Sequence, residues 1–497
     1  MQKSIIIIGA GMAGLSAGCY AQMNGYTTHI FEQHVLPGGV CTSWKRKGYT
    51  FDCCIHNLGG SGEASKFHRI WRELGAVPTR PMIAYDEFVQ VEEGTHVFTV
   101  FTDIDKLETH MKTLSPADAE VIEELTNAAR RLTSFELFSA PITGTWSFIR
   151  ALTVAPSLMK WARINLKRYA TRFTDPFLRK AFPTVMYDSE DAPMLFLLNF
   201  LAWMHNRDLG WSVGGSLEFS KAIASRYQEL GGTFRYKSRV AKILVENDKA
   251  VGVVLADGTE HQADIVISNA DGRTTIFDML EGKYTNERIR AYYAKPAEQQ
   301  AMTVHVSFGV NRDISGEPHA LVLFLEKPVT IMDGDVDRLD VELTSHDASM
   351  APPGKGVIKV VLNSSYAYWK SLYQTYEAYE AEKQRLAETL ADELEMRFPG
   401  FKEQIEVVDV ATPMTFERYT GAWQGFQAPL PGEGFSAALN ILNILRGKGW
   451  CRTLPGLKNF YMIGQWAGDF GLAATAVSGR NLIKRICKSD GKRFRAE

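Results

Sequence analysis

Three glycines near the amino terminus have the spacing that binds phosphate groups: Gly9, Gly11 and Gly14 form the pattern G-x-G-x-x-G. In this pattern the first glycine permits a tight turn, the second lets the backbone approach a pyrophosphate, and the third lets a helix pack closely on a sheet. Glu32 follows where an acidic side chain accepts hydrogen bonds from the hydroxyls of an adenosine ribose. These residue types at this spacing predict a dinucleotide-binding site.

The elements expected around the glycines are those that such a site requires. Residues Ser4 to Ile8 are almost wholly apolar, as in a parallel strand buried on both faces, and Thr27 to Phe31 has the pattern of a second strand. Leu15 to Asn24 is expected to form the helix between them, closed by Gly25. Its first turn would direct free N–H groups and the positive end of the helix dipole toward the phosphates. A glycine turn without a ligand is the alternative, which this complete unit disfavours.

A second glycine pair, Gly38 and Gly39, follows soon after Glu32. It suits a long extended ligand such as FAD, whose pyrophosphate and ribityl chain need further close approach of the backbone. The alternative is a plain surface turn, because Pro37-Gly38-Gly39 has strong turn chemistry of its own. These residues alone leave both interpretations open.

Two later parts of the chain decide for FAD by resemblance. Residues Gly231 to Asp271 have the pattern of strands and a hairpin, and Asn459 to Ile463 is expected to be a strand that precedes a helix from Gly471 to Ile486. With the first unit they resemble the discontinuous FAD domain of the flavoprotein superfamily that contains amine oxidases and phytoene desaturases. The resemblance implies that Val240 packs near the adenine and that the last helix points its first turn at the pyrimidine edge of the flavin.

Within that superfamily the chain most resembles the phytoene desaturase and carotenoid isomerase family, the phytoene dehydrogenase-related FAD-dependent oxidoreductases. The resemblance covers nearly the full length, and its order and spacing are specific where each motif alone is weak. The motifs that carry it are Gly48-Tyr49-Thr50-Phe51-Asp52, Leu114-Ser115-Pro116-Ala117-Asp118, Val213-Gly214-Gly215-Ser216, Ser268-Asn269-Ala270-Asp271, Asp347 with Ala351-Pro352-Pro353-Gly354, and Thr412-Pro413 before Phe416-Glu417.

The resemblance implies an α/β fold, in which a Rossmann-like FAD-binding domain of the amine oxidase and phytoene desaturase type holds an inserted substrate domain of mixed sheet and helices. The FAD-binding domain would comprise residues 1–79, 210–281 and 448–497, and the substrate domain residues 80–209 and 282–447. The residues expected to bind FAD are Gly9, Gly11, Met12, Ala13, Gly14, Glu32, Gln33, Gly38, Gly39, Val40, Cys41, Val240, Ser268, Asn269, Ala270, Gly464, Asp469, Leu472, Ala473 and Ala474. Asp469 would contact the ribityl chain or cap the last helix.

The chain departs from the family pattern where the flavin ring is expected. Val40 stands where many members have an arginine after the glycine pair, so one cationic phosphate contact is missing. Cys54-Ile55-His56 replaces the common Gly-Pro, and Gly464-Gln465-Trp466-Ala467 replaces a Gly-Ala-Gly-Thr type of sequence. The exact substrate and chemistry therefore do not carry over from the family.

His56 is the candidate catalytic residue, because the segment after Phe51-Asp52 would run along the flavin toward the substrate cavity. An imidazole there can donate or accept a proton. The alternative is a hydrogen-bonded structural histidine. Glu417, Arg418 and Tyr419 would lie in the cavity wall, where a structural ion pair or a solvated strand edge is the favoured role.

Composition excludes several classes of function. The chain has 497 residues and a net charge of −2, which gives no reason to expect a nucleic-acid partner. Its six cysteines have no zinc spacing, so no metal site is expected, and a reducing, cytoplasmic location is the simpler interpretation. The apolar start lacks a signal-peptide pattern, and the other long apolar run, Pro193 to Met204, is too short to span a bilayer.

A basic amphipathic helix is expected from Ser157 to Phe173, with Lys160, Arg163 and Lys167 on one face. Such a helix can lie on an anionic membrane surface, which would give access to a substrate dissolved in lipid. The alternative is a solvated cationic face on a helix that packs into its own domain. A peripheral membrane contact therefore remains open.

These observations predict an FAD-dependent oxidoreductase that acts on carbon–carbon bonds of a bulky, apolar, lipid-like substrate, such as an isoprenoid polyene or an unsaturated acyl chain. Desaturation would pass a hydride to flavin N5, and the electrons would leave to a quinone or oxygen. The alternatives are a double-bond isomerase that uses reduced FAD without net redox, an amine oxidase-like flavoenzyme, and a flavoprotein that binds a lipid without turnover.

Overall fold

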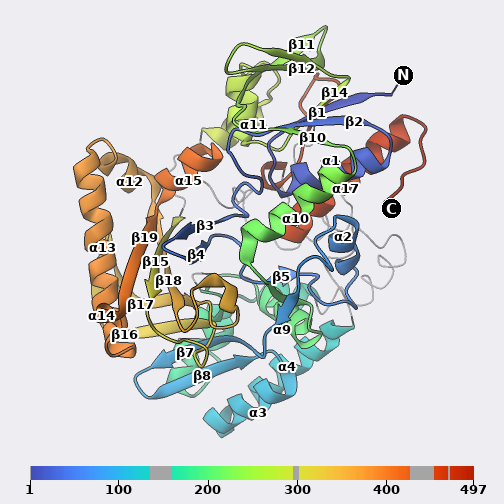
Figure 1. Ribbon diagram of the computed structural model, residues 1–497. Coiled ribbons are helices and arrows are strands. Elements are labelled where there is room, and N and C mark those ends of the chain that lie inside the picture. Colours follow the sequence, from blue (N-terminus) through green and yellow to red (C-terminus); the bar gives the residue numbers. More distant parts are fainter. Residues whose placement is uncertain are drawn as a thin grey trace.

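The computed structural model describes residues 2–134, 158–187, 189–294, 301–425, 453–467 and 471–496. In these residues the chain passes back and forth between two large sheets. A parallel sheet with its helices occupies the upper part of the molecule in Figure 1, and a mixed sheet with its helices occupies the lower part.

The parallel sheet is assembled from three distant parts of the chain, residues 4–31, 233–268 and 460–462, in the order β10-β2-β1-β14-β20. The central strands are β1 (Ser4–Ile8), β2 (Thr27–Phe31) and β14 (Ile265–Ser268), and the edges are β10 (Thr233–Arg235) and β20 (Phe460–Met462). All pairings within it are parallel. The strands predicted near the start, middle and end of the sequence thus lie in one sheet, whereas the exact domain boundaries stay a prediction.

Both faces of β1 are buried because its alternate isoleucines enter different cores. Ile5 and Ile7 pack with the helices α1 (Met12–Met23), α10 (Gly215–Glu229) and α17 (Leu472–Ser489), which lie side by side in Figure 1. Ile6 and Ile8 pack against the antiparallel strands β11 (Val240–Glu246) and β12 (Lys249–Leu255), to which β13 (Glu260–Gln262) is added. The period of two along a strand explains this division.

Helix α17 fits against α1 through a glycine. At Gly479 an added Cβ would lie 2.5 Å from the carbonyl oxygen of Ala13 and 2.7 Å from the amide nitrogen of Ala17. Close by, the Ser16 hydroxyl donates a 2.5 Å hydrogen bond to the carbonyl oxygen of Ala476. The two helices therefore approach closely, which fixes where the last helix begins relative to the glycine loop before α1.

The second sheet has seven strands in the order β19-β15-β18-β17-β16-β7-β8. The pairing of β16 with β7 is parallel, and the others are antiparallel. The bounds of the strands are β7 (Glu87–Glu93), β8 (His96–Phe101), β15 (Ala301–Val310), β16 (Ala320–Ile331), β17 (Gly334–Leu343), β18 (Gly356–Ser365) and β19 (Ile405–Ala411).

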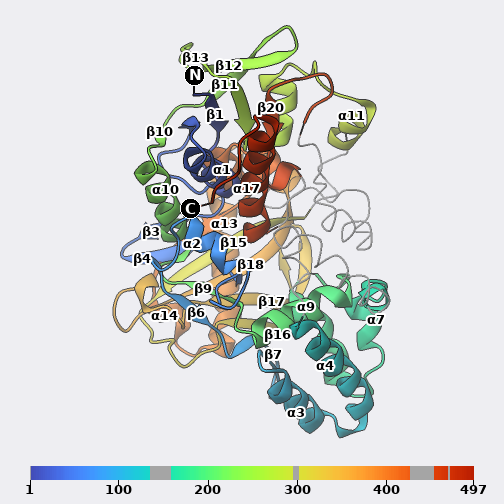
Figure 2. The ribbon, with the colours of Figure 1, turned by 90° about the vertical axis from the view of Figure 1, so that its right-hand side faces the viewer.

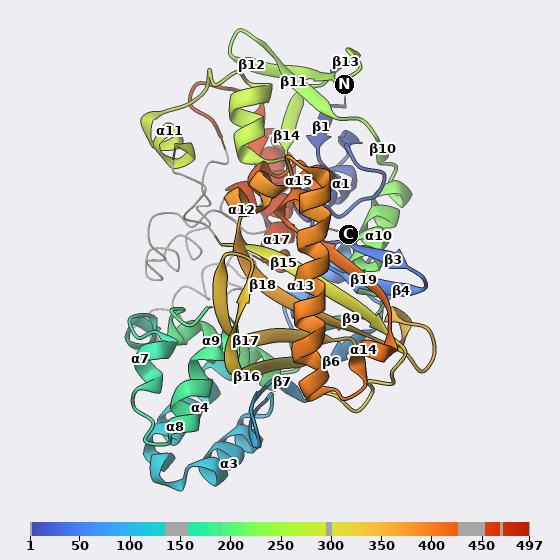
Figure 3. The same cartoon turned by 90° about the vertical axis from the view of Figure 1, so that its left-hand side faces the viewer.

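The long helix α13 (Tyr376–Arg397) covers one face of this sheet, as Figure 3 shows. Its Leu386, Leu390 and Leu394 enter a core with apolar side chains of β15, β17 and β18, such as Val306 and Val341. Neighbouring residues on those strands point to the opposite face. That opposite face carries the buried polar residues His305, Ser307, Asp340 and Lys359 and the partly exposed Glu342.

A helical lobe packs against the β7–β8 end of the second sheet, at the lower right of Figure 2. It contains α3 (Ile104–Leu114), α4 (Ala119–Thr133), α7 (Leu166–Ala170), α8 (Pro176–Ala181) and α9 (Met194–His205). The inserted mixed sheet and helices expected from the sequence are therefore present. In the described part of the chain, no helix combines the length and apolar character that crossing a membrane requires.

The continuous basic helix predicted up to Phe173 is wrong. The helix that contains Lys160 ends before Arg163, and α7 begins at Leu166, because the side chain of Asn165 caps it by accepting the Arg168 N–H at 2.8 Å. Residue 157, where the predicted helix starts, lies outside the described residues.

The apolar side of this segment belongs to the core of the lobe, where Leu158, Leu166 and Phe173 are buried. Lys160 forms a 2.5 Å ion pair with Glu124, and Lys167 forms a 3.0 Å ion pair with Glu190. The alternative of a helix packed into its own domain therefore fits the structure, and the apolar face that a membrane would need is already covered.

We predict that Gly479→Ala lowers the free energy of unfolding by about 1–3 kcal/mol, the usual effect of extra volume in a packed interior. The added methyl group would push α17 away from the backbone of α1. Gly316→Ala is the control, because a Cβ there meets no atom within 4 Å. Chemical denaturation with equal midpoints for the two variants would contradict the close approach of the helices.

Candidate functional site

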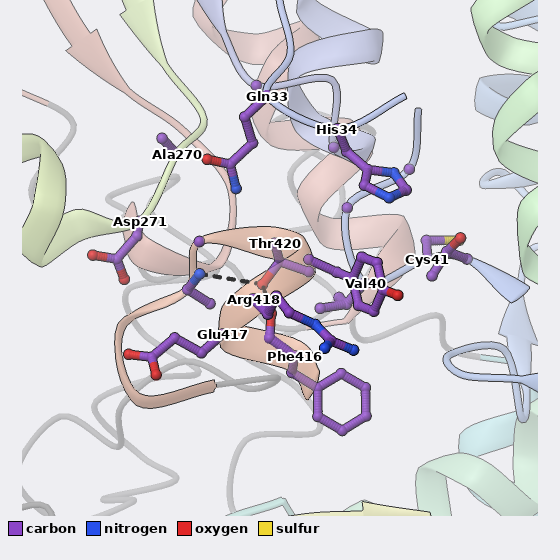
Figure 4. Close-up of a pocket in the computed structure, with 18 of the residues that line it drawn as sticks. Gln33, His34, Val40, Cys41, Ala270, Asp271, Phe416, Glu417, Arg418 and Thr420 are labelled. Carbon is purple, nitrogen blue, oxygen red and sulfur yellow. Dashed lines mark hydrogen bonds between the residues drawn. The ribbon is translucent and has the colours of Figure 1, made fainter. Parts of the chain in front are cut away.

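A cavity of about 1050 Å³ lies at the carboxyl ends of β1, β2 and β14 and extends to the helices above the second sheet. Figure 4 shows part of its wall, with Gln33 and His34 on one side and α15 (Pro413–Thr420) on the other. The predicted cofactor-binding residues that line it are Gly9, Gly11, Met12, Ala13, Glu32, Gln33, Gly38, Gly39, Val40, Cys41, Val240, Asn269, Ala270, Gly464 and Leu472. Residues more than 400 positions apart are thus brought to one site.

Four predicted cofactor-binding residues lie outside the lining. Gly14 serves packing, because a Cβ there would collide with the carbonyl oxygen of Gly9. The Ser268 hydroxyl is buried in a 2.8 Å hydrogen bond with the Thr275 hydroxyl. Ala473 and Ala474 follow Leu472 on α17 without lining the cavity. Asp469 lies outside the described residues.

Glu32 joins the first glycine loop to the end of β2. Its carboxylate accepts the N–H of Ala10 at 2.7 Å and the N–H of His34 at 2.8 Å. Burial raises the pKa of this carboxyl group, against the lowering effect of the two N–H donors. A carboxylate oxygen has two lone pairs, so Glu32 keeps acceptor capacity for a ribose hydroxyl on the cavity side.

Asn269 is the residue on which the glycine loops converge. A Cβ at Gly11 would lie 2.8 Å from its Nδ2 atom, and a Cβ at Gly464 would lie 2.7 Å from its Oδ1 atom. With the amide turned so that oxygen faces the loop, the oxygen accepts the N–H groups of Gly11 and Gly14, each at 3.2 Å. The absence of side chains at Gly11 and Gly464 is therefore needed to make room for Asn269.

The second glycine pair lies directly on the first loop. Gly38 donates its N–H to the carbonyl oxygen of Ala10 at 2.9 Å and forms a parallel bridge with Gly11. Gly38 has φ +114°, where other residues are strained, and its Cβ would collide with the carbonyl oxygen of Cys41. Because this turn is part of the cavity wall, it is not the plain surface turn that the sequence left open.

Two helices begin at the cavity directly after a glycine, so their N-cap residues have no side chain that could accept a hydrogen bond. Gly11 precedes α1 and Gly471 precedes α17. In α1 the turned amide of Asn269 accepts the Gly14 N–H, which leaves the N–H groups of Met12 and Ala13 as the donors of that turn. Met12 and Leu472, in those first turns, line the cavity. Uncapped N–H groups and two positive dipole ends favour an anionic ligand such as a pyrophosphate. This donor set and the glycine surfaces fit a dinucleotide.

Helix α15 forms the opposite wall and starts with a reciprocal capping box between Thr412 and Thr415. Phe416, Glu417, Arg418 and Thr420 follow on it, as Figure 4 shows. Phe416 and Thr420 were not anticipated as wall residues, although Thr412 followed by Pro413 is a sequence signal for the start of a helix.

Glu417 lies on helix α15, so it is not at the solvated strand edge expected as one alternative, and its described contact is not the ion pair expected as the other. Glu417 instead accepts a 2.9 Å hydrogen bond from the Tyr366 hydroxyl, and the Arg418 guanidinium lies 4.8 Å from the ring centre of Tyr419. Asp271 faces this helix across the cavity and accepts the N–H of Trp423 at 3.1 Å. Burial raises the pKa of the Asp271 carboxyl group.

His56 does not line the large cavity but a small neighbouring pocket of about 40 Å³. Cys53 and Cys54 line the large cavity, whereas Ile55, His56 and Asn57 line the small pocket. This short segment therefore connects the two spaces. The His56 side chain is 40% exposed, and its Nδ1 atom lies 2.5 Å from Oε1 of Glu342.

Glu342 also receives Lys359 Nζ at 2.6 Å, so one carboxylate joins two basic side chains. Glu342 and Lys359 are cross-strand partners on β17 and β18. Burial opposes the charge on Glu342, but His56 and Lys359 more than offset it and hold the pKa of the carboxyl group well below its usual range. Glu342 is thus ionised at neutral pH and fixes Nδ1 of His56 as a donor.

Comparisons with known proteins agree with this geometry. A model of the NAD(P)-binding Rossmann-like domain matches residues 7–74. A chloroplastic prolycopene isomerase of Daucus carota is 26% identical over 456 residues, covering 86% of this chain and 72% of its own. A lycopene-forming phytoene desaturase of Paracoccus is 24% identical over 493 residues, covering 93% and 92%.

Among solved structures, putrescine oxidase bound to putrescine superposes with a TM-score of 0.57 at 13% identity, covering 98% of this chain and 99% of that one. These comparisons confirm the resemblance to phytoene desaturases and carotenoid isomerases, the fold class and the expectation of an enzyme. Within the described residues, no group of three His, Cys, Asp or Glu side chains is placed to hold a metal ion.

We predict that Gly11→Ala lowers the amount of dinucleotide bound to the purified protein at least about tenfold, equivalent to about 1.4 kcal/mol. The added methyl group would occupy the surface that a pyrophosphate needs and would press on Asn269. Absorbance of the supernatant after denaturation measures the cofactor, and Gly316→Ala is again the control. Equal cofactor content in both variants would contradict the assignment of this loop.

Proposed function

We propose that the protein is an FAD-dependent oxidoreductase that acts on carbon–carbon bonds of a bulky, apolar, lipid-like substrate, such as an isoprenoid polyene or an unsaturated acyl chain, by desaturation. The observation that carries this proposal is the large cavity at two helix starts that follow glycines, in a chain similar to phytoene desaturases and prolycopene isomerases over most of its length.

Bound FAD would supply the two-electron acceptor of the desaturation, and a quinone or oxygen would take the electrons onward. The residues of the chain itself would hold the cofactor in position. The starts of α1 and α17 would hold the anionic and electron-rich parts of such a cofactor, and Glu32 would offer an acceptor for its ribose. Val240, buried beside Phe31, would pack near the adenine.

His56 is proposed as the residue that moves a proton, because Glu342 occupies Nδ1 and leaves Nε2 as the ring atom available for transfer. Glu342 would act as its positioning residue, as a carboxylate does when it selects one tautomer of an imidazole. The cytoplasm is the proposed location, since Cys19, Cys41, Cys53, Cys54 and Cys487 all carry free thiols.

A double-bond isomerase that uses reduced FAD is the second candidate, favoured by the prolycopene isomerase among the relatives. Amine oxidation is supported by fold alone, because the putrescine oxidase is only 13% identical. A flavoprotein that binds lipid without turnover would need the same cavity but no proton-moving residue.

Anaerobic mixing of the oxidised holoenzyme with phytoene or prolycopene tests the reaction. We expect the visible flavin absorbance to bleach within one turnover, because the two electrons have no other acceptor. An isomerase would leave oxidised flavin unchanged and would need prior reduction by dithionite. Many turnovers to an isomeric product with substoichiometric reductant would contradict desaturation, and free FAD with the same lipids is the control.

The proton-moving role of His56 is tested by His56→Phe. We expect the variant to retain FAD and to reduce it about 10²–10⁴-fold more slowly, the usual contribution of a general acid or base. His96→Phe, at an exposed position on β8, is the matched control. Added imidazole should partly restore the rate of His56→Ala, and an unchanged rate in His56→Phe would make the residue structural.

A further inference from the structure

A two-stranded hairpin ends at the wall of the large cavity with two cysteines opposite each other. Its strands are β3 (Ser43–Arg46) and β4 (Tyr49–Asp52). Past the last pair of the ladder, Cys53 donates its N–H to the carbonyl oxygen of Thr42 at 3.1 Å, so the antiparallel register continues. The next opposite residues are Cys41 and Cys54, and both line the large cavity, where Figure 4 shows Cys41.

This position in the hairpin brings two side chains close enough for a disulfide. Because Thr42 and Cys53 share a backbone hydrogen bond, Cys41 and Cys54 form the neighbouring kind of pair, which shares none and has the closer side chains. Opposite Cβ atoms lie about 4.5–5.5 Å apart, at the shorter end in such pairs, and a disulfide requires about 3.5–4.5 Å. The thiol groups of Cys41 and Cys54 are in hydrogen-bond contact with each other. The Cys53 side chain alternates to the other side of the strand, where it packs with Phe416.

The two thiol groups differ in their access to the cavity. Cys41 is only 1% exposed, and its Sγ atom lies 3.6 Å from the carbonyl oxygen of Ser216. The hydrogen bond with Cys54, together with burial, holds the pKa of the Cys41 thiol well above its usual range, so this thiol is protonated at neutral pH. Cys54 is half-buried and lines the cavity. A small reagent in the cavity therefore meets Cys54 first, with Cys41 as the adjoining thiol.

We propose that Cys41 and Cys54 are a redox-active thiol pair, which hydrogen peroxide converts into a disulfide in the wall of the large cavity. The Cys54 thiol would attack one oxygen of the peroxide, giving a sulfenic acid on Cys54 and one molecule of water. The Cys41 thiol would then attack that sulfur atom, so that the S–S bond forms and a second water leaves with the Cys41 proton. The two thiols lose two electrons in total, and the peroxide is reduced to two waters.

Peroxide is the oxidant expected at this place. Oxygen, one of the two acceptors proposed above, becomes hydrogen peroxide when it takes two electrons and two protons. The disulfide would protect both cysteines from irreversible oxidation to sulfinic acid, and it would tie the second glycine turn to the segment that carries His56. Only the source of the peroxide rests on the proposed function, because the pair itself would react equally with peroxide that is added.

Peptide mapping of the purified holoenzyme tests the proposal. The reduced protein is treated with a small excess of hydrogen peroxide, unfolded in iodoacetamide and digested with trypsin, which cleaves between Cys41 and Cys53. We expect one linked species, which joins the peptide that contains Cys41 to the peptide that contains Cys53 and Cys54, and dithiothreitol should separate the two. Cys19 and Cys487 are the internal controls and should be alkylated, because both are 0% exposed and neither lines the cavity.

Substitutions identify the two partners and the order in which they react. Cys53→Ala should retain the linked species, whereas Cys54→Ala should lose it. In Cys41→Ala the reaction should stop at the sulfenic acid of Cys54, which dimedone labels. In Cys54→Ala dimedone should not label Cys41, because that thiol is buried and protonated.

Three results would overturn the proposal: alkylation of both Cys41 and Cys54 in the wild type after peroxide, a linked species that survives in Cys54→Ala, or sulfinic acid on Cys54 without a disulfide. The wild-type map needs no substitution, so a variant that fails to fold leaves the test intact. A disulfide in a protein whose flavin is not bleached by phytoene or prolycopene would keep the thiol pair and overturn the desaturase. Bleaching without a disulfide would do the reverse.

Discussion

The site depends on the parallel hydrogen bonding of one strand, β1, with its neighbours β2 and β14. The glycine loop begins where β1 ends, Glu32 follows the end of β2, and Asn269 follows the end of β14. Because parallel strands present their carboxyl ends at the same edge, register alone brings the loop, the acid and the amide together. The pairing of β14 with β20 adds Gly464 in the same way. A slip of one residue would also move the isoleucines of β1 into the wrong core.

The two faces of the second sheet differ in chemistry, because the sheet is apolar toward α13 and polar toward the site. Ser307, Lys359 and Glu342 lie in one row across β15, β18 and β17. Burying an ion pair is seldom a net gain in stability, whereas removing one partner leaves a buried charge and is strongly destabilising. The row is therefore better explained by the position in which it holds His56 than by a contribution to the stability of the fold.

Local patterns in the sequence were sufficient for much of the architecture. The strand, glycine loop and helix at the start, the strands β14 and β20 and the last helix α17 follow from periodicity, glycine positions and the resemblance. Strand β17 was missed, and its alternation of acidic and apolar residues is typical of a strand with one face in water. No local pattern distinguishes a face in water from one that lines an interior site.

The functional pairing of side chains was harder to predict than the elements that carry them. His56 was named from its place in a motif, but its partner Glu342 is 286 positions away and lies on the missed strand. The predicted helix up to Phe173 failed for a similar reason, because Asn165 caps a new helix in the middle of an unbroken amphipathic pattern. In both cases the hydrogen bond of a single side chain determined the structure: the contact of His56 with Glu342 and the helix cap formed by Asn165.

The assembly of the parallel sheet from both ends of the chain has a consequence for biosynthesis. Strand β20 and helix α17 belong to the same candidate site as the glycine loop but are synthesised more than 400 residues after it. At about 5–20 residues per second, the finished glycine loop would wait roughly 20–90 s for them. During that interval the apolar face of α1 that α17 later covers is open to solvent, so the nascent chain has most need of a chaperone at this surface.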